Sequence, residues 1–120
     1  MTTDAAPPAE TTLEIDVRSI GGATVVRVAG ELDVFTSARL RAVLFDPVLC
    51  GGPHVIVDLE GVTFMDSTSI GVLVGARRWI ASRDGEVALV CALGPALRVL
   101  GLVGLDKVFA IYPSVAEAIG

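Results

Sequence analysis

Two short apolar runs, His54–Leu59 and Glu86–Leu93, constrain most strongly what this chain can fold into. Each has the length of a strand and is nearly continuous in apolar side chains, which is typical of strands buried on both faces of a sheet. Each is followed by a segment of helical length, about Ser67–Ser82 after the first and about Gly94–Gly104 after the second. Strands separated by helices lie parallel and cross over right-handedly. The two runs therefore predict an α/β fold around a mostly parallel sheet.

A hairpin is expected ahead of this parallel part. Residues Leu13–Arg18 alternate apolar and charged side chains, which is the pattern of a half-buried strand. Gly21-Gly22 supplies a tight turn, and the Val-rich segment Thr24–Ala29 forms the second strand. The hairpin adds an antiparallel edge to the sheet.

The remaining elements complete one domain. A helix is expected from Thr36 or Ser37 to about Leu49, and Pro47 should bend it or end it early. Val108–Ile111 reads as a last strand, and Ser114 with Glu117 forms a capping box that opens a terminal helix. The predicted order is ββαβαβαβα, with about four helices.

One domain is all that 120 residues are expected to form. Residues 1–12 contain Ala, Pro and Thr without an apolar period, and they are predicted to be a flexible tail. Residues 13–120 are predicted to be the domain.

Charge and hydropathy exclude several classes of protein. A formal net charge of −5 argues against nucleic-acid binding, because phosphate backbones are held by Lys and Arg clusters. Although 52% of the residues are hydrophobic, every apolar run is interrupted before the roughly 18 to 20 residues that a membrane helix needs. The start, Met1-Thr2-Thr3-Asp4, lacks the segments of a signal peptide. These features predict a cytoplasmic protein that binds no membrane.

No constellation of catalytic residues is apparent. His54 is the single histidine and has no acidic or cysteine partner nearby in the sequence, and no glycine-rich stretch carries a phosphate-binding lysine. Cys50 and Cys91 lack metal-ligand spacing and are expected to be reduced, structural thiols. The prediction is a protein that is not an enzyme and holds no cofactor or metal.

The segment Asp66-Ser67-Thr68-Ser69 stands out because it places four polar residues between two apolar stretches. Its simplest role is to cap the following helix, since Asp, Ser and Thr satisfy the free amides of a helix start. Yet one capping residue suffices, and the segment follows a strand at the edge of the sheet where α/β folds place their sites. A helix N-terminus also accommodates an added phosphate.

Two neighbouring features extend this candidate site. Asp33 also follows a strand, and successive strand ends gather at one edge of such a sheet, so Asp33 is expected near Ser67. The first turns of the next helix are apolar all round, with Val72 among Ile70–Val74. These side chains are either buried beneath another element or form a contact patch beside the hydroxyls.

The segments Gly30-Glu31-Leu32-Asp33 and Val62-x-Phe64-Met65-Asp66-Ser67-Thr68 resemble the anti-sigma-factor antagonist branch of the STAS domain family. The resemblance extends over about 13–120 and includes the order of elements given above. It implies that Ser67, directly after Asp66, is phosphorylated by an anti-sigma factor that is an ATP-dependent serine kinase. The unphosphorylated protein would bind that kinase and free its sigma factor.

The partner surface implied by this reading comprises six residues. They are Asp33, Asp66, Ser67, Thr68, Ser69 and Val72. A protein phosphatase is a further expected partner, and the protein itself is expected to be a monomer or a weak dimer.

One position departs from the resemblance, because Ser69 stands where the family usually has glycine, as in Asp-Ser-Thr-Gly-Leu-Gly. Two other functions remain open for a STAS-like domain. It could be an accessory subunit of a transport ATPase, or it could bind a nucleotide at the same edge of the sheet.

Overall fold

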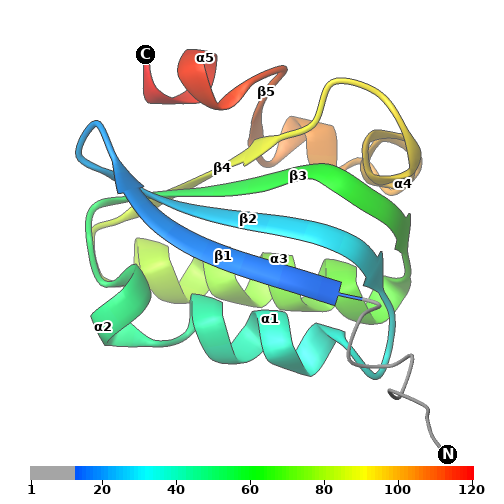
Figure 1. Ribbon diagram of the computed structural model, residues 1–120, viewed down its shortest axis with the longest axis horizontal. Coiled ribbons are helices and arrows are strands. Elements are labelled where there is room, and N and C mark those ends of the chain that lie inside the picture. The colour runs from blue at the N-terminus through cyan, green and yellow to red at the C-terminus, as the bar shows by residue number, and fades with distance from the viewer. Residues whose placement is uncertain (1–12) are drawn as a thin grey trace, which may run out of the picture.

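The computed structural model describes residues 13–120, and the predicted tail, residues 1–12, lies outside this range (Figure 1). In chain order the elements are β1 (Leu13–Ile20), β2 (Ala23–Leu32), α1 (Ser37–Leu44), α2 (Pro47–Cys50), β3 (His54–Met65), α3 (Ser67–Ala81), β4 (Glu86–Val90), α4 (Pro95–Leu102), the 3-10 helix η3 (Leu105–Lys107), β5 (Ala110–Tyr112) and α5 (Val115–Ile119).

The five strands form one sheet whose spatial order, β1-β2-β3-β4-β5, is the order of the chain. β1 and β2 pair antiparallel, from Leu13 opposite Gly30 to Ile20 opposite Ala23, and the later neighbours pair parallel. Gly21 and Gly22 both have positive φ, +58° and +82°, which the two-residue turn of a twisted hairpin requires. The predicted fold class is therefore confirmed, including the antiparallel hairpin and the order of elements.

The number of helices differs from the prediction, because residues 13–120 contain five α-helices rather than about four. Proline cannot donate a backbone hydrogen bond, so Pro47 ends the expected long helix instead of bending it. α1 stops at Leu44, and a separate single turn, α2, begins at Pro47. The side chain of Asp46 caps this turn by accepting a hydrogen bond from the amide of Val48 at 2.8 Å.

Two strands at the far side of the sheet have shifted ends. β4 ends at Val90, short of the predicted Leu93. β5 begins at Ala110 rather than Val108, because the chain first makes the 3-10 turn η3.

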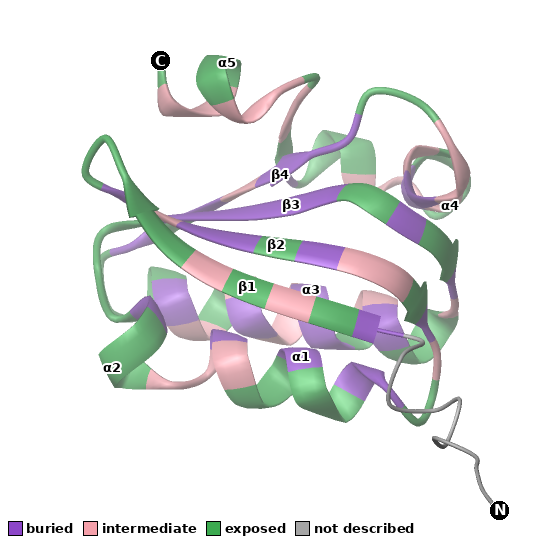
Figure 2. Cartoon of the chain, viewed as in Figure 1, coloured by how far each residue is buried: buried purple, intermediate pink, exposed green. Residues whose placement is uncertain are grey.

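The core lies between the sheet and the layer formed by α1, α2 and α3, which Figure 1 shows side by side beneath it. Buried and exposed residues alternate along the strands and these helices, and the buried ones face the core (Figure 2). The main contributors are Val26, Val28, Val55, Val57, Leu89, Leu40, Leu44, Leu73, Ala76 and Ile80. On the opposite face, α5 packs a smaller cluster against Val25, Ile56 and Val90.

β3 is twice as long as expected and carries two irregularities. Its pairing with β2 shifts between Arg27 and Ala29 and again between Gly30 and Glu31, so each shift adds one residue to β3. Such bulges change which side chains face the core. As a result Leu59, Val62 and Met65 are buried at intervals of three, and Phe64 points outward.

No helix within residues 13–120 is long and apolar enough to cross a membrane. The thiols of Cys50 and Cys91 are both buried, and neither forms a disulfide, as expected. Burial raises the pKa of Cys50 to about 11 and raises that of Cys91 as well, so both remain protonated at neutral pH.

Gly61 makes the first bulge possible, because an added Cβ would lie 2.8 Å from the Cβ of Ala29. We expect Gly61→Ala to lower the free energy of unfolding by about 1–3 kcal/mol, since the two strands would have to move apart. Gly71→Ala is the matched control: a Cβ there meets nothing within 4 Å. On an exposed helix face it should stabilise by about 0.5–1 kcal/mol. Urea unfolding measures both, and an unchanged stability for Gly61→Ala would contradict the close approach of these strands.

Candidate functional site

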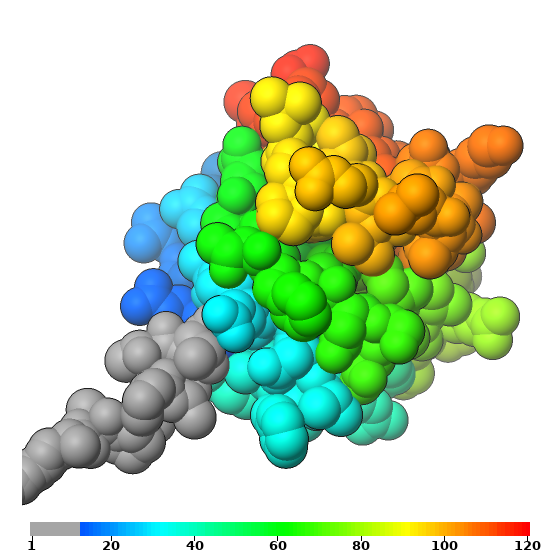
Figure 3. Space-filling view, turned by 90° about the vertical axis from the view of Figure 1, so that its right-hand side faces the viewer, coloured from blue at the N-terminus to red at the C-terminus, as the bar shows by residue number. Residues whose placement is uncertain are grey.

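The candidate site lies where β2 and β3 end side by side. Leu32 pairs with Met65, and the amide of Asp66 donates to the carbonyl of Leu32 at 3.1 Å. Asp33 and Ser67 each follow within two residues of this pair, so their connections to α1 and α3 emerge together. Figure 3 faces this end of the molecule and shows the β2–α1 connection in cyan against the β3–α3 connection in green. This is the neighbourhood expected for Asp33 and Ser67.

Asp33 holds the turn into α1. Its Oδ1 accepts hydrogen bonds from the amides of Thr36 at 2.8 Å and Phe35 at 2.9 Å. The hydroxyl of Thr36 lies 2.6 Å from the carbonyl oxygen of Glu31 and accepts from the amide of Asp33. These donors, above all the Thr36 amide, hold the pKa of Asp33 below its ordinary value, so its charge persists to lower pH.

Asp66 is the N-cap of α3. Its backbone is extended, and its Oδ1 accepts from both the amide and the hydroxyl of Ser69, at 3.1 and 3.2 Å. The Ser69 side chain has no solvent exposure. Ser69 therefore belongs to the cap and not to the surface on which the sequence had placed it.

Ser67 and Thr68 form the first two positions of α3, and both are exposed. Their hydroxyls make no hydrogen bond within residues 13–120, whereas that of Ser69 is engaged. Amides at these positions precede the first i→i−4 bond of a helix. In α3 the first such bond is donated by the amide of Ile70 to the carbonyl of Asp66. The amides of Ser67 and Thr68 are therefore not used within the helix.

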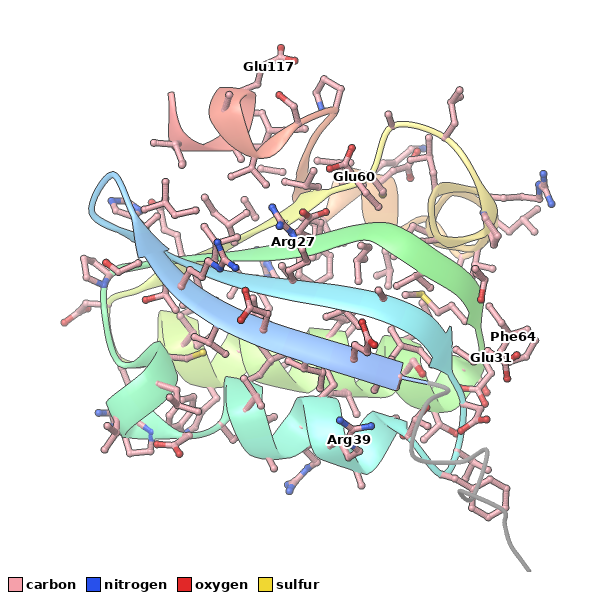
Figure 4. The ribbon with its side chains drawn as sticks, viewed as in Figure 1. Arg27, Glu31, Arg39, Glu60, Phe64 and Glu117 are labelled. Carbon is pink, nitrogen blue, oxygen red and sulfur yellow. The ribbon has the colours of Figure 1, made fainter. Side chains whose placement is uncertain are left out.

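Exposed apolar side chains lie at the same end of the sheet as the two hydroxyls. Phe35, in the β2–α1 connection, is 84% exposed, and its neighbour Val34 is also exposed. Phe64, the residue before Met65, is 48% exposed and projects from the sheet end beside Glu31 (Figure 4). Together with Ser67 and Thr68 these residues make up the switch surface, an apolar area that carries two free hydroxyls.

Sequence reasoning missed Phe35 and Phe64 as surface residues. Phe64 lies beyond the predicted strand, in the part of β3 where two bulges change which side chains face the core, and Gly61 at the first bulge was the available signal. Phe35 carried a usable signal, since an aromatic residue two positions after a strand-terminating Asp has no periodic partner in the core.

Val72 does not contribute to this surface. It is 9% exposed and packs in the main core, and Leu73 is buried with it. Ile70 and Val74 are half-buried against the same core. Burial beneath other elements therefore accounts for the apolar first turns of α3, and the proposed contact patch is supplied instead by the two connections described above.

His54 lies at the opposite end of β3, where its Nδ1 is 3.8 Å from a carboxylate oxygen of Glu86. A hollow of about 200 Å³ beside it is lined by Tyr112, Ala118 and other residues of that end. Within residues 13–120 no three His, Cys, Asp or Glu side chains are grouped so that they could hold a metal ion.

Comparison with known proteins identifies the fold and the family. The STAS domain family matches residues 14–118. The anti-sigma F factor antagonist of Paenibacillus polymyxa is 32% identical over 110 residues, covering 89% of this chain and 92% of the relative. The anti-sigma-B factor antagonist of Staphylococcus aureus is 35% identical over 86 residues, covering 72% and 80%.

Among solved structures, an anti-sigma factor antagonist from Mycobacterium paratuberculosis superposes with a TM-score of 0.81 at 28% identity, covering 89% of this chain and 91% of that one. These relatives are regulatory binding proteins rather than enzymes. The chain therefore belongs to the STAS domain family, in its anti-sigma-factor antagonist branch.

Proposed function

We propose that this protein binds an anti-sigma factor serine kinase while Ser67 is unmodified, and that phosphorylation of Ser67 by that kinase releases it. The observation that carries the proposal is the exposed Ser67 hydroxyl at the first position of α3, bordered by exposed Phe35 and Phe64. The names of its relatives support an anti-sigma factor as the partner. Binding would free the sigma factor, so the protein would act in the cytoplasm, where transcription takes place.

Geometry favours Ser67 among the three hydroxyls as the phosphate acceptor. Ser69 is buried and bonded to Asp66, so it is closed to a kinase. Successive helical residues point about 100° apart, so Ser67 and Thr68 cannot face one active site equally. Ser67 is the first residue of α3 and is closer in the chain to the end of β3 than Thr68 is, on the face that a docked partner would cover.

Phosphate would act on the interface and leave the fold intact. The start of α3 offers free amides and the positive end of the helix dipole, both of which stabilise an anion. Across the interface, however, about −1.5 to −2 charges would have to be buried against a partner that contacts Phe35 and Phe64. A loss of about 3 kcal/mol in binding weakens the complex more than a hundredfold, which is enough for a switch. A protein phosphatase would restore binding.

Variants of Ser67 test the switch. Ser67→Ala should abolish phosphorylation and keep tight binding to the kinase, because the interface loses only one hydroxyl. Ser67→Glu should bind about tenfold to a hundredfold more weakly, since it adds a buried charge at the same point. Thr68→Ala is the matched control and should still be phosphorylated. Mass spectrometry after incubation with the kinase and ATP locates the phosphate, and calorimetry gives the affinities.

Phosphate found on Thr68, with Ser67→Ala still a good substrate, would contradict the assignment of the acceptor. If an active kinase modifies none of the hydroxyls, the segment serves only as a helix cap.

Asp33 should contribute to binding separately from its role in the turn. Asp33→Asn keeps an oxygen that can accept from Thr36 and Phe35, so it should change the melting temperature little and still weaken kinase binding by removing a charge. Asp33→Ala removes both the acceptor oxygen and the charge, so it should lower the melting temperature as well as weaken binding. Comparing the two variants by calorimetry and thermal melting separates the roles. If Asp33→Asn lowers the melting temperature as strongly as it weakens kinase binding, Asp33 serves the turn alone.

A further inference from the structure

The cationic side chains of this acidic protein are concentrated in one layer. The helical layer is defined here as 37–50 and 67–85, which contain α1, α2, α3 and the turn after α3. Five of the nine Lys and Arg residues lie in it, but only two of the 14 acidic residues, Asp46 and Asp84. The five are Arg39, Arg41, Arg77, Arg78 and Arg83. The layer is thus positive, although the chain carries a net charge of −5.

Two of these arginines bracket a pair of stacked rings, and the four residues form what we call the Arg–aromatic stack. The Cζ of Arg41 lies 4.8 Å from the centre of the Phe45 ring. Phe45 and Trp79 have ring centres 5.4 Å apart, and the Cζ of Arg83 lies 4.9 Å from the Trp79 ring.

The guanidinium groups of the stack have no carboxylate partner among residues 13–120. The ion pairs in that range involve Arg18, Arg27 and His54. Both Arg41 and Arg83 are exposed, and Phe45 and Trp79 are half-buried. Stacking on a ring fixes a guanidinium in place while leaving its N–H edges open, so less side-chain freedom is lost when a carboxylate binds.

The stack is separate from the switch surface. α1 and α3 run side by side with their N-termini at the same end (Figure 1). Trp79 is twelve residues beyond Ser67, or about 18 Å along the helix axis at 1.5 Å per residue. A protein bound at Ser67 and one bound at Trp79 and Arg83 would therefore contact different ends of α3.

We propose that the Arg–aromatic stack binds an acidic segment of a partner protein. The two guanidinium groups receive its Asp or Glu carboxylates, and the edges of Phe45 and Trp79 contact its apolar atoms. Arg, Trp and aromatic side chains of this kind are enriched where interfaces concentrate their binding energy. A short acidic segment is favoured over a nucleic acid because a phosphate backbone is held by extended clusters of Lys and Arg, whereas the stack offers two guanidinium groups.

Trp79 is the only tryptophan of the chain, so its fluorescence reports directly on the stack. Titration of the full chain with an acetylated hexaglutamate amide in 50 mM NaCl should change the emission saturably. Raising NaCl to 300 mM should weaken the affinity at least about threefold, because exposed charges are screened. The double variant Arg41→Gln/Arg83→Gln should lose at least about tenfold in affinity. Arg98→Gln/Lys107→Gln removes the same charge from exposed positions outside the layer and should bind as the parent does.

A circular dichroism melt shows whether each variant is folded. Equal affinity of both double variants, or no saturable change up to 5 mM peptide, would overturn the proposal. Tighter binding of a 12-nucleotide single strand than of the peptide would assign the stack to nucleic acid instead. An emission change on dilution of the protein alone would assign it to a second copy, which also contradicts the proposal.

Discussion

The parallel pairing of Leu32 with Met65 is the constraint on which the site depends. It brings the ends of β2 and β3 to the same level, and the bond from the Asp66 amide to the Leu32 carbonyl closes the pair. Each strand is then followed by a helix: Asp33 holds the turn that leads into α1, and Asp66 caps the first turn of α3. These two aspartates fix the connections that carry Phe35, Ser67 and Thr68. A shift of one residue in this pairing would bury Phe64 and expose Met65, because strand side chains alternate.

The sequence was sufficient for the architecture because the relevant signals are local. The apolar run at His54–Leu59, the Gly21-Gly22 turn and the capping pair Ser114–Glu117 each specify one element without reference to the rest of the chain. The sequence was not sufficient where the structure depends on how two strands pair with each other. The bulges of β3 arise from its register against β2, and only that register explains why Phe64 is outside and Met65 inside. Burial of Val72 and Ser69 likewise depends on how α3 lies against α1 and the sheet.

The cap of α3 would allow the proposed phosphate at Ser67 to be added without loss of the fold. One carboxylate oxygen of Asp66 accepts from both the amide and the hydroxyl of Ser69, so the first turn of the helix is held on its buried side. The hydroxyl is the additional contact that serine provides at a position where glycine would offer only its amide. Charge added on the exposed side then acts chiefly on whatever docks there, in keeping with the general behaviour of phosphates at helix N-termini. Trp79 and Arg83 of the Arg–aromatic stack lie at the C-terminal end of α3, the end opposite Ser67.

The most direct measurement is hydrogen–deuterium exchange of the protein with and without its cognate anti-sigma factor, before and after phosphorylation. The account predicts slower amide exchange within residues 33–36 and 64–70 on binding, and no slowing at the Gly21-Gly22 turn at the other end of the sheet. The Ser67-phosphorylated protein, at the same concentrations, should show no slowing in either range and an otherwise unchanged exchange pattern. Protection confined to other parts of the chain, or equal protection with and without the phosphate, would contradict an interface switch at Ser67.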